Sequence, residues 1–272
     1  TMGIARDRPL PRFRRETFLD WMGDRPSGIR IADADHRVLL VPDTMVNYSR
    51  PEIGEAAVTV LEGANCHVEV PDGLTDVGRP ALSKGFLDDA RATAETMVDT
   101  LAPSVEDGWD VVFLEPSDAV MVQSDYSDLL TREALSSVQA STYGICEYLD
   151  RTDLLDVIDF ESAAEHLTYH GHCHQKATKT DGHAVAVLEE AGYVVDRLDS
   201  GCCGMAGSFG YEAEHYSMSQ AIGRILFDQV ESSPGETIVA PGASCRTQLA
   251  SRVPENEEPP HPIEKVDDAI ST

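Results

Sequence analysis

The chain has 272 residues, and 48 acidic against 21 basic residues give it a formal net charge of −27. This length is enough to bury the cores of one or two α/β domains, whereas the excess of acid excludes the basic patches that nucleic-acid binding requires. The acidic residues are spread along the whole chain, which is typical of a solvated, halophilic acidic surface.

The sequence has neither a membrane-spanning run nor a signal-peptide pattern. Six cysteines without a secretion signal argue against a disulfide framework. The first residues, Thr1-Met2-Gly3-Ile4, do not look like a natural start, so we expect a segment cut from a longer chain. Residues 1–35 are rich in Arg and Pro and are predicted to form an N-terminal arm.

Residues 36–150 have the pattern of a first α/β lobe. Short apolar runs predict buried parallel strands at 38–41, 67–70 and 111–114. A helix is expected to begin near Pro51, because proline is favoured in a first helical turn. Further helices are expected at 87–101 and over most of 128–150.

Residues 151–272 repeat this order as a second lobe. Strands are predicted at 166–169, 194–198 and 237–239, and helices at 184–191, 212–227 and 263–270. An overlay of the lobes matches Gly78 with Gly204, and it places first-lobe residues without thiols opposite the second-lobe cysteines: Thr44, Asp76, Val77 and Asp118. The sequence therefore predicts an α/β fold of two pseudo-duplicated βαβ lobes, with mostly parallel sheets flanked by helices.

The run Gly201-Cys202-Cys203-Gly204 holds two adjacent thiols among glycines. Adjacent cysteines rarely bond to each other, but both can face one soft metal centre where glycine lets the backbone turn sharply. Exposed N–H groups can then donate to sulfur. The alternative is a flexible loop that holds two buried free thiols.

Two further cysteines, Cys173 and Cys245, also follow predicted strands. Ligands of α/β folds bind outside the carboxyl ends of the strands. We therefore expect Cys173, Cys202, Cys203 and Cys245 to converge on one metal centre. The other two cysteines, Cys66 and Cys146, are interpreted as ordinary core residues.

Four thiolates suit either an iron–sulfur cluster or structural zinc. Candidate donors or charges beside the thiols are His172, His174, Lys176 and Arg246, each of which could equally be structural. Asp76 and Asp118 are expected to be solvated or capping residues. No catalytic residue is assigned, because the sequence has no Ser/His/Asp signature, no P-loop and no Gly-x-Gly-x-x-Gly run after a strand.

Three segments together, 170–177, 201–211 and 244–246, resemble the cysteine-rich CCG domain family. They are most similar to the C-terminal iron–sulfur region of flavin-linked D-lactate-type dehydrogenases. The family also includes the C subunit of anaerobic glycerol-3-phosphate dehydrogenase and the B subunit of heterodisulfide reductase. The resemblance implies that Cys173, Cys202, Cys203 and Cys245 hold an iron–sulfur cluster, expected to be of the 4Fe–4S type, with zinc as the alternative. It also implies FAD on a partner segment or chain.

The chain departs from the family pattern at two places. Fuller members have thiols at the four first-lobe positions named above, so residues 36–150 are predicted to lack a cluster. Some members have Cys-x-x-Cys in the last motif, whereas Gly242 holds the first of these positions here. A four-thiol site is therefore expected rather than a five-thiol site.

The resemblance implies an iron–sulfur electron-transfer domain or subunit of a flavin-dependent 2-hydroxy-acid (D-lactate/glycolate-type) dehydrogenase, not competent for the full reaction alone. The implied partners are a flavin-binding dehydrogenase domain or subunit, a ferredoxin-like iron–sulfur domain, and a quinone or membrane-associated acceptor. They place the chain in the cytoplasm, or peripherally at the inner face of the membrane. Alternatives are a C-type subunit of glycerol-3-phosphate dehydrogenase, a heterodisulfide-reductase-type subunit, a zinc-stabilised non-redox interaction module, and a thiol switch that joins Cys173 and Cys245 reversibly.

Overall fold

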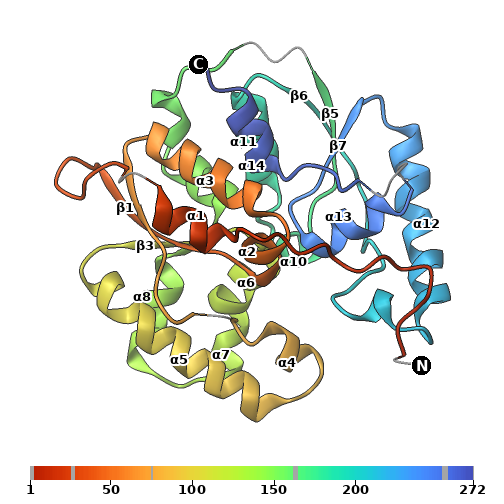
Figure 1. The fold of residues 1–272 in the computed structure, drawn as a ribbon, viewed down its shortest axis with the longest axis horizontal. Coiled ribbons are helices and arrows are strands. Elements are labelled where there is room, and N and C mark those ends of the chain that lie inside the picture. Colours follow the sequence, from red (N-terminus) through yellow and green to blue (C-terminus); the bar gives the residue numbers. More distant parts are fainter. Residues whose placement is uncertain (1–2, 26–27, 75, 162–164, 253–256, 272) are drawn as a thin grey trace. The chain divides into compact units, whose positions relative to one another are not determined.

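The structure is a computed structural model that describes residues 3–25, 28–74, 76–161, 165–252 and 257–271. It divides into two compact units (Figure 1). The N-terminal unit is Phe13–Ile158, and the C-terminal unit comprises the described residues of 159–272 together with residues 3–12. Thr1 and Met2, which begin the unnatural start predicted above, lie outside the described residues. The predicted lobe boundaries after residues 35 and 150 stay predictions.

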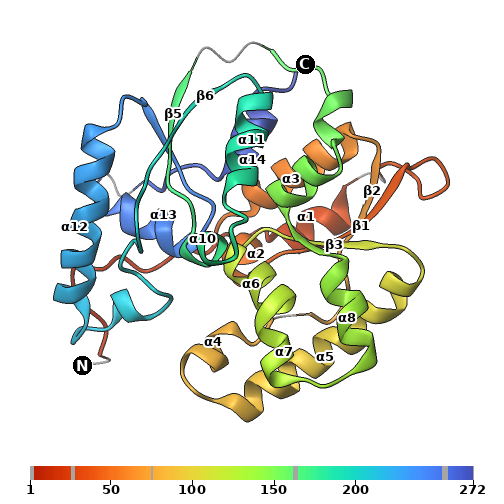
Figure 2. The ribbon, with the colours of Figure 1, turned by 180° about the vertical axis from the view of Figure 1, so that it is seen from behind.

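A four-stranded parallel sheet forms the centre of the N-terminal unit. Its strands lie in the order β2 (Cys66–Glu69), β1 (His36–Val41), β3 (Asp110–Phe113) and β4 (Thr142–Gly144). Figures 1 and 2 show α3 (Pro51–Gly63) on one side of this sheet and α5 (Leu87–Glu106) with α8 (Glu133–Ala140) on the other. Helices on both sides explain why β1 is apolar from Val38 to Val41 and β3 from Val111 to Phe113.

The other helices of this unit are α1 (Phe18–Asp24), α2 (Thr44–Tyr48), α4 (Arg79–Ser83), α6 (Pro116–Val120), α7 (Tyr126–Leu129) and α9 (Ile145–Arg151), with a π-helical turn at Met121–Asp125 and a 3₁₀ turn at Leu154–Val157. The segment 128–150 is mostly helical, as expected, but it also contains β4, which the sequence analysis did not predict. This strand pairs Thr142 with Val111 and Tyr143 with Val112. Pairing with β3 rather than local propensity makes these residues a strand.

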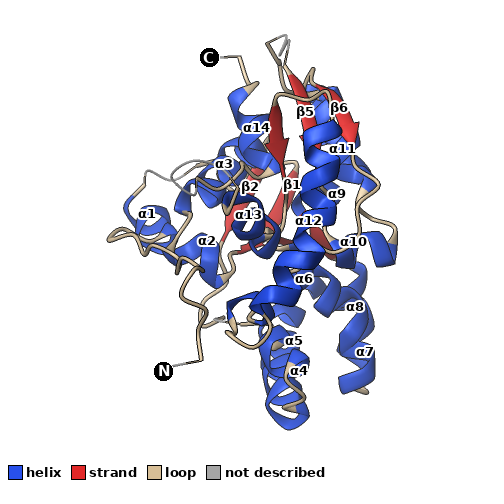
Figure 3. Cartoon of the chain, turned by 90° about the vertical axis from the view of Figure 1, so that its right-hand side faces the viewer, coloured by secondary structure: helices blue, strands red, loops and turns tan. Residues whose placement is uncertain are grey.

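A three-stranded parallel sheet forms the centre of the C-terminal unit. Its order is β6 (Val194–Arg197), β5 (His166–Tyr169) and β7 (Thr237–Val239). The sheet lies between α12 (Tyr216–Ser232) on one side and α11 (Gly182–Glu190) with α14 (Pro262–Asp268) on the other (Figures 1 and 2), and α11 packs against β6 (Figure 3). Two short helices, α10 (Cys173–Thr178) and α13 (Ala243–Ala250), directly follow β5 and β7.

The prediction of an α/β fold with parallel sheets flanked by helices is confirmed. The order β2-β1-β3 in one unit corresponds to β6-β5-β7 in the other. The overlaid glycines also correspond, because Gly78 (φ 84°) and Gly204 (φ 93°) are both left-handed. A Cβ would lie 3.1 Å from the Ala90 carbonyl oxygen of α5 at Gly78, and 2.4 Å from the Ser219 carbonyl oxygen of α12 at Gly204. Each glycine lets the loop after the second strand approach the next long helix closely.

Residues 3–12 pack within the C-terminal unit. Ile4 forms an antiparallel bridge with Glu212, and the amide of Ala5 donates to the carbonyl oxygen of Tyr211 at 2.8 Å. Across the described ranges of the chain, no helix is both long and apolar enough to cross a membrane.

Candidate metal centre

Four thiols lie at one edge of the C-terminal sheet. Because β5, β6 and β7 are parallel, their carboxyl ends share this edge. Cys173 begins α10 after β5, Cys202 and Cys203 follow β6, and Cys245 lies in α13 after β7. The structure thus brings the four predicted site residues together. Cys66 and Cys146 are buried in the other unit, in β2 and α9.

Pairwise interactions link the four thiols: Cys173 with Cys202, Cys202 with Cys203, and Cys203 with Cys245. Hydrogen bonds from Cys173 and Cys203 hold the pKa of Cys202 well below its usual value, and a hydrogen bond from Cys203 does the same for Cys245. The pKa values of the donors Cys173 and Cys203 are raised by the same contacts. Mutual contacts that lower the pKa values of some of these thiols suit ligands that must release protons when a metal binds.

Backbone amides also point at the sulfur atoms. The amide of Gly204 donates to Cys202 Sγ at 3.3 Å. Hydrogen bonds from the amides of His174 and Met205 partly oppose the rise in the pKa values of Cys173 and Cys203. Donors of this kind stabilise thiolates and tune a bound cluster.

The site has a dry side and an open side. Cys203 and Cys245 are 4% and 2% exposed and belong to a hydrophobic cluster with Met205, Leu226 and Leu249. Cys202, in contrast, is exposed, and Cys173 is half-buried. A centre held by these thiols would be shielded by the core on one side and accessible on the other.

His170 is a site residue that the sequence analysis did not single out. It is 1% exposed, its Nδ1 lies 2.6 Å from Ser200 Oγ, and, after the larger effect of Cys203, it helps to lower the pKa of Cys245. Its membership of the run 170–174, with three histidines around Cys173, was the available signal.

Lys176 lies beside the same group. Its Nζ donates to the backbone carbonyl oxygen of Ser200, and to Ser200 Oγ at 3.0 Å. Burial lowers the pKa of Lys176, while Asp181 and Cys245 act in the opposite direction. Gly171 makes room for this arrangement, since a Cβ there would lie 3.1 Å from Lys176 Cε. Lys176 therefore interacts electrostatically with Asp181 first and with Cys245 second.

The other three residues predicted to lie beside the thiols are His172, His174 and Arg246, and they differ in their placement. His172 is buried and caps α10 by accepting from the amide of His174 at 3.3 Å. The two histidine rings lie edge to face with centroids 5.1 Å apart. Arg246 is 2% exposed and donates to the carbonyl oxygens of Ala240 and Pro241. Its contacts are with the turn after β7 and with Glu258, whose Oε2 lies 3.9 Å from Arg246 Nε, and they indicate a structural role.

The spacing of the thiols bears on the kind of metal. Among the described residues, three candidate ligand atoms lie within 4.8 Å of one another at Glu212, Glu214 and His215, but no three of the four sulfur atoms are grouped so closely. Four thiolates around one zinc ion at about 2.3 Å would be about 3.8 Å apart. The set of four sulfurs is thus spread more widely than the ligands of one zinc ion.

A fifth thiol has no room at residue 242. A Cβ on Gly242 would lie 2.4 Å from His172 Cδ2, closer than van der Waals contact allows. Glycine at position 242 therefore leaves room for the buried His172 ring.

The corresponding edge of the N-terminal unit carries carboxylates in place of thiols. Asp76 accepts from the amide of Gly78 at 2.9 Å in the turn before α4, a helix that has no side-chain cap. Val77 is buried, and its carbonyl oxygen accepts from Tyr126 Oη at 2.8 Å. Asp118 is not simply solvated: burial, with Asp43, Glu115 and Asp76 nearby, raises its pKa well above its usual value.

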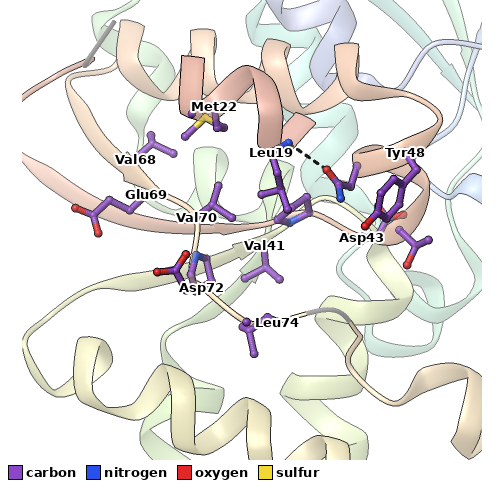
Figure 4. Close-up of a pocket in the computed structure, with 16 residues that line it drawn as sticks. Leu19, Met22, Val41, Asp43, Tyr48, Val68, Glu69, Val70, Asp72 and Leu74 are labelled. Carbon is purple, nitrogen blue, oxygen red and sulfur yellow. Dashed lines mark hydrogen bonds between the residues drawn. The ribbon is translucent and has the colours of Figure 1, made fainter. Parts of the chain in front are cut away.

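A pocket of about 550 Å³ opens beyond β1 and β2 in the same unit (Figure 4). Its lining is apolar at Leu19, Met22, Val41 and Leu74, and Leu19 is held by a hydrogen bond of 3.1 Å from its amide to Asn47 Oδ1. The described lining residues also include carboxylates and no lysine or arginine: Asp43, Glu69 and Asp72. This charge disfavours anionic ligands.

Comparison with known proteins places the thiol site in a recognised domain. Residues 167–250 match the model of the CCG family, described as a cysteine-rich domain. This range includes all four site cysteines, and the predicted family resemblance is confirmed for it.

Similarity to individual proteins extends over more of the chain than the family match at 167–250. It is 27% identical over 251 residues to the C subunit of the anaerobic glycerol-3-phosphate dehydrogenase of Escherichia coli (strain K12), a match that covers 90% of this chain and 62% of that protein. It is 24% identical over 221 residues to lactate utilization protein A of Halalkalibacterium halodurans, which covers 77% of this chain and 86% of that protein. It is 25% identical over 217 residues to D-2-hydroxyglutarate dehydrogenase of Escherichia coli (strain K12), which covers 78% of this chain but 21% of that protein. The chain thus spans less than two thirds of the first and the last of these relatives.

Proposed function

We propose that this chain is the iron–sulfur electron-transfer part of a flavin-linked dehydrogenase, and that Cys173, Cys202, Cys203 and Cys245 ligate its cluster. The observation that carries the proposal is the convergence of these four thiols at the carboxyl edge of one parallel sheet. Iron–sulfur clusters are commonly held by four cysteine thiolates. A cluster bound here would accept electrons one at a time from the flavin of a partner and release them to an acceptor such as quinone.

The residues of the chain have separate tasks in this function. The amides of His174, Gly204 and Met205 donate to ligand sulfurs, and such donors stabilise negative charge on thiolates. Lys176 interacts electrostatically with Cys245, while the core around Cys203 and Cys245 excludes water. The exposed Cys202 gives the site its accessible side, toward which a redox partner would bind.

The substrate class follows from the chemistry that the named relatives share. Glycerol 3-phosphate, lactate and 2-hydroxyglutarate are anions in which a secondary alcohol is oxidised to a ketone, a two-electron reaction suited to flavin. The acidic lining of the pocket in Figure 4 disfavours such anions. We therefore assign substrate oxidation to a flavin-binding partner, with a 2-hydroxy acid as substrate and glycerol 3-phosphate as the alternative. Electron transfer to quinone would place the assembly at the inner face of the membrane.

Metal analysis of the whole chain after anaerobic reconstitution with iron and sulfide tests the proposal. We expect bound iron and sulfide, a broad visible absorption, and a paramagnetic signal on reduction. Replacing any one of the four site cysteines by alanine should remove most of the iron. Cys146→Ala is the matched control, because Cys146 is also buried but lies in α9. Stoichiometric zinc without iron would favour the zinc-stabilised interaction module, and full iron retention in Cys202→Ala would refute the ligand assignment.

A further inference from the structure

Arg8 is a buried cation in the N-terminal segment. It is 3% exposed, its Nε donates to the Gly210 carbonyl oxygen at 3.1 Å, and its Nη2 donates to Ser219 Oγ at 3.3 Å. The guanidinium carbon also lies 5.3 Å from the centroid of the Tyr216 ring. These contacts fix the guanidinium against the loop and helix that follow Cys203.

The charge of Arg8 has no partner of opposite sign in the described part of the chain. No carboxylate forms an ion pair with it there, and its Nη1 is buried without a hydrogen-bond acceptor. Burial lowers its pKa, whereas Tyr216, Tyr211 and Cys203 act in the opposite direction. An unpaired buried charge destabilises a fold by several kcal/mol as an order of magnitude. A guanidinium retained in such a place therefore calls for an anion.

We propose that Arg8 is the built-in counter-charge of the metal–thiolate centre, so that the N-terminal segment 3–12 completes a site formed by residues 170–246. Four thiolates around a cation of charge two carry a net negative charge. Arg8 hydrogen-bonds to Gly210 and Ser219, and Gly210 lies against Met205, which packs in one cluster with Cys203 and Cys245. The electrostatic interaction of Arg8 with Cys203 agrees with this placement. Arg8 thus acts on the centre through its charge. The inference rests on the proposed thiol site, but it holds for any metal that the thiolates bind.

Cadmium titration tests this role without requiring a cluster. Cadmium–thiolate absorption in the ultraviolet reports binding to the full chain, and competition with a chelator gives the affinity. We expect Arg8→Gln, which keeps a hydrogen-bonding side chain but no charge, to bind cadmium about tenfold more weakly. Arg8→Lys should retain most of the affinity. Arg6→Gln is the matched control, because Arg6 is an exposed arginine of the same segment.

A second measurement separates the effect of the Arg8 charge on metal binding from the effect of its packing on stability. The gain in melting temperature on adding cadmium should be smaller in Arg8→Gln than in the wild type, while Arg6→Gln should show the wild-type gain. For the reconstituted iron centre, loss of the neighbouring positive charge should make the reduction potential more negative. Failure of the wild type to take up iron would count against the proposed redox function alone. Wild-type cadmium affinity in Arg8→Gln, or equal weakening in Arg6→Gln, would overturn the counter-charge role.

Discussion

At the scale of single residues, Gly242 shows how one missing Cβ shapes the site. Gly242→Ala would place a Cβ 2.4 Å from the His172 ring, and overpacking of this kind costs about 1–3 kcal/mol of unfolding free energy. Gly201→Ala is the control, since a Cβ there meets nothing within 4 Å and should change stability by less than about 0.5 kcal/mol. Urea unfolding of both variants checks the prediction, and equal stability of the two would contradict the proposed contact.

Asp118 gives a pH dependence with a definite sign. Burial, together with Asp43, Glu115 and Asp76, raises its pKa above the usual 3.8, against the smaller opposing effect of Arg79. A carboxyl group with a raised pKa in the folded state loses relative stability as pH rises through that pKa.

We therefore expect Asp118→Asn to increase the unfolding free energy at pH 7, and we expect this gain to vanish below about pH 3.8, where both states are protonated. Urea unfolding from acid to neutral pH measures it. The exposed Asp128→Asn is the control. A gain that persists at low pH would show that removal of charge is not the cause.

The sequence identified the four thiols because each follows an apolar strand, but two residues beside them could not be predicted equally well. Arg8 is one of several arginines near the start of the chain, and only the fold shows that it is buried while Arg6 is exposed. Lys176 and Arg246 were both candidate charges, yet Lys176 interacts electrostatically with Cys245 and Arg246 turns toward the backbone of Ala240 and Pro241. The direction of a long side chain depends on packing, which no local pattern encodes.

At the scale of elements, the loop after β6 depends on its contact with α12. Gly204→Ala would combine a left-handed backbone (φ 93°) with a Cβ 2.4 Å from the Ser219 carbonyl oxygen. We expect it to lower the unfolding free energy by more than about 2 kcal/mol, with loss of metal binding.

Gly207→Ala separates the effect of backbone strain from the effect of the Cβ contact that Gly204→Ala would make. Gly207 is also left-handed (φ 62°), but a Cβ there would lie in open space, so we expect a loss of only about 1 kcal/mol. Thermal unfolding with a cadmium titration distinguishes the two variants. If both lost the same stability, backbone strain alone would account for Gly204.

Element prediction succeeded where burial on both faces made runs within strands continuously apolar, as in β1 and β3. It missed β4, a strand of three residues between two helices, because its pairing with β3 is a long-range contact. It also missed α10 and α13, which begin within the cysteine motifs and are too short for a helical period to be recognised.

At the scale of the whole molecule, the net charge of −27 predicts a dependence on salt. Repulsion between acidic residues destabilises the folded state, and ions screen it over about 10 Å at 0.1 M but only about 3 Å at 1 M. We expect potassium chloride to raise the unfolding free energy on the order of 1–2 kcal/mol across this range.

A variant with less charge provides the control. Asp89→Asn combined with Glu95→Gln removes two exposed acids from α5 and should reduce the salt response. The neutral change Ala92→Ser on the same helix should leave the response as it is. A salt response that is absent, or is the same in all three proteins, would argue against an acidic surface adapted to high salt.

The pairing of residues 3–12 with the loop at 210–213 has a consequence for biosynthesis. Residues 13–158, which form the other unit, are translated after segment 3–12 and before the loop at 210–213. Segment 3–12, which carries Arg8, therefore cannot pack until that whole unit has been synthesised. Residue 245, the last of the cysteine ligands, is delivered later still. A metal that needs all four thiols could therefore bind only after residue 245 has been translated, and a chain arrested earlier would expose Arg8 and the free thiols to cellular quality control.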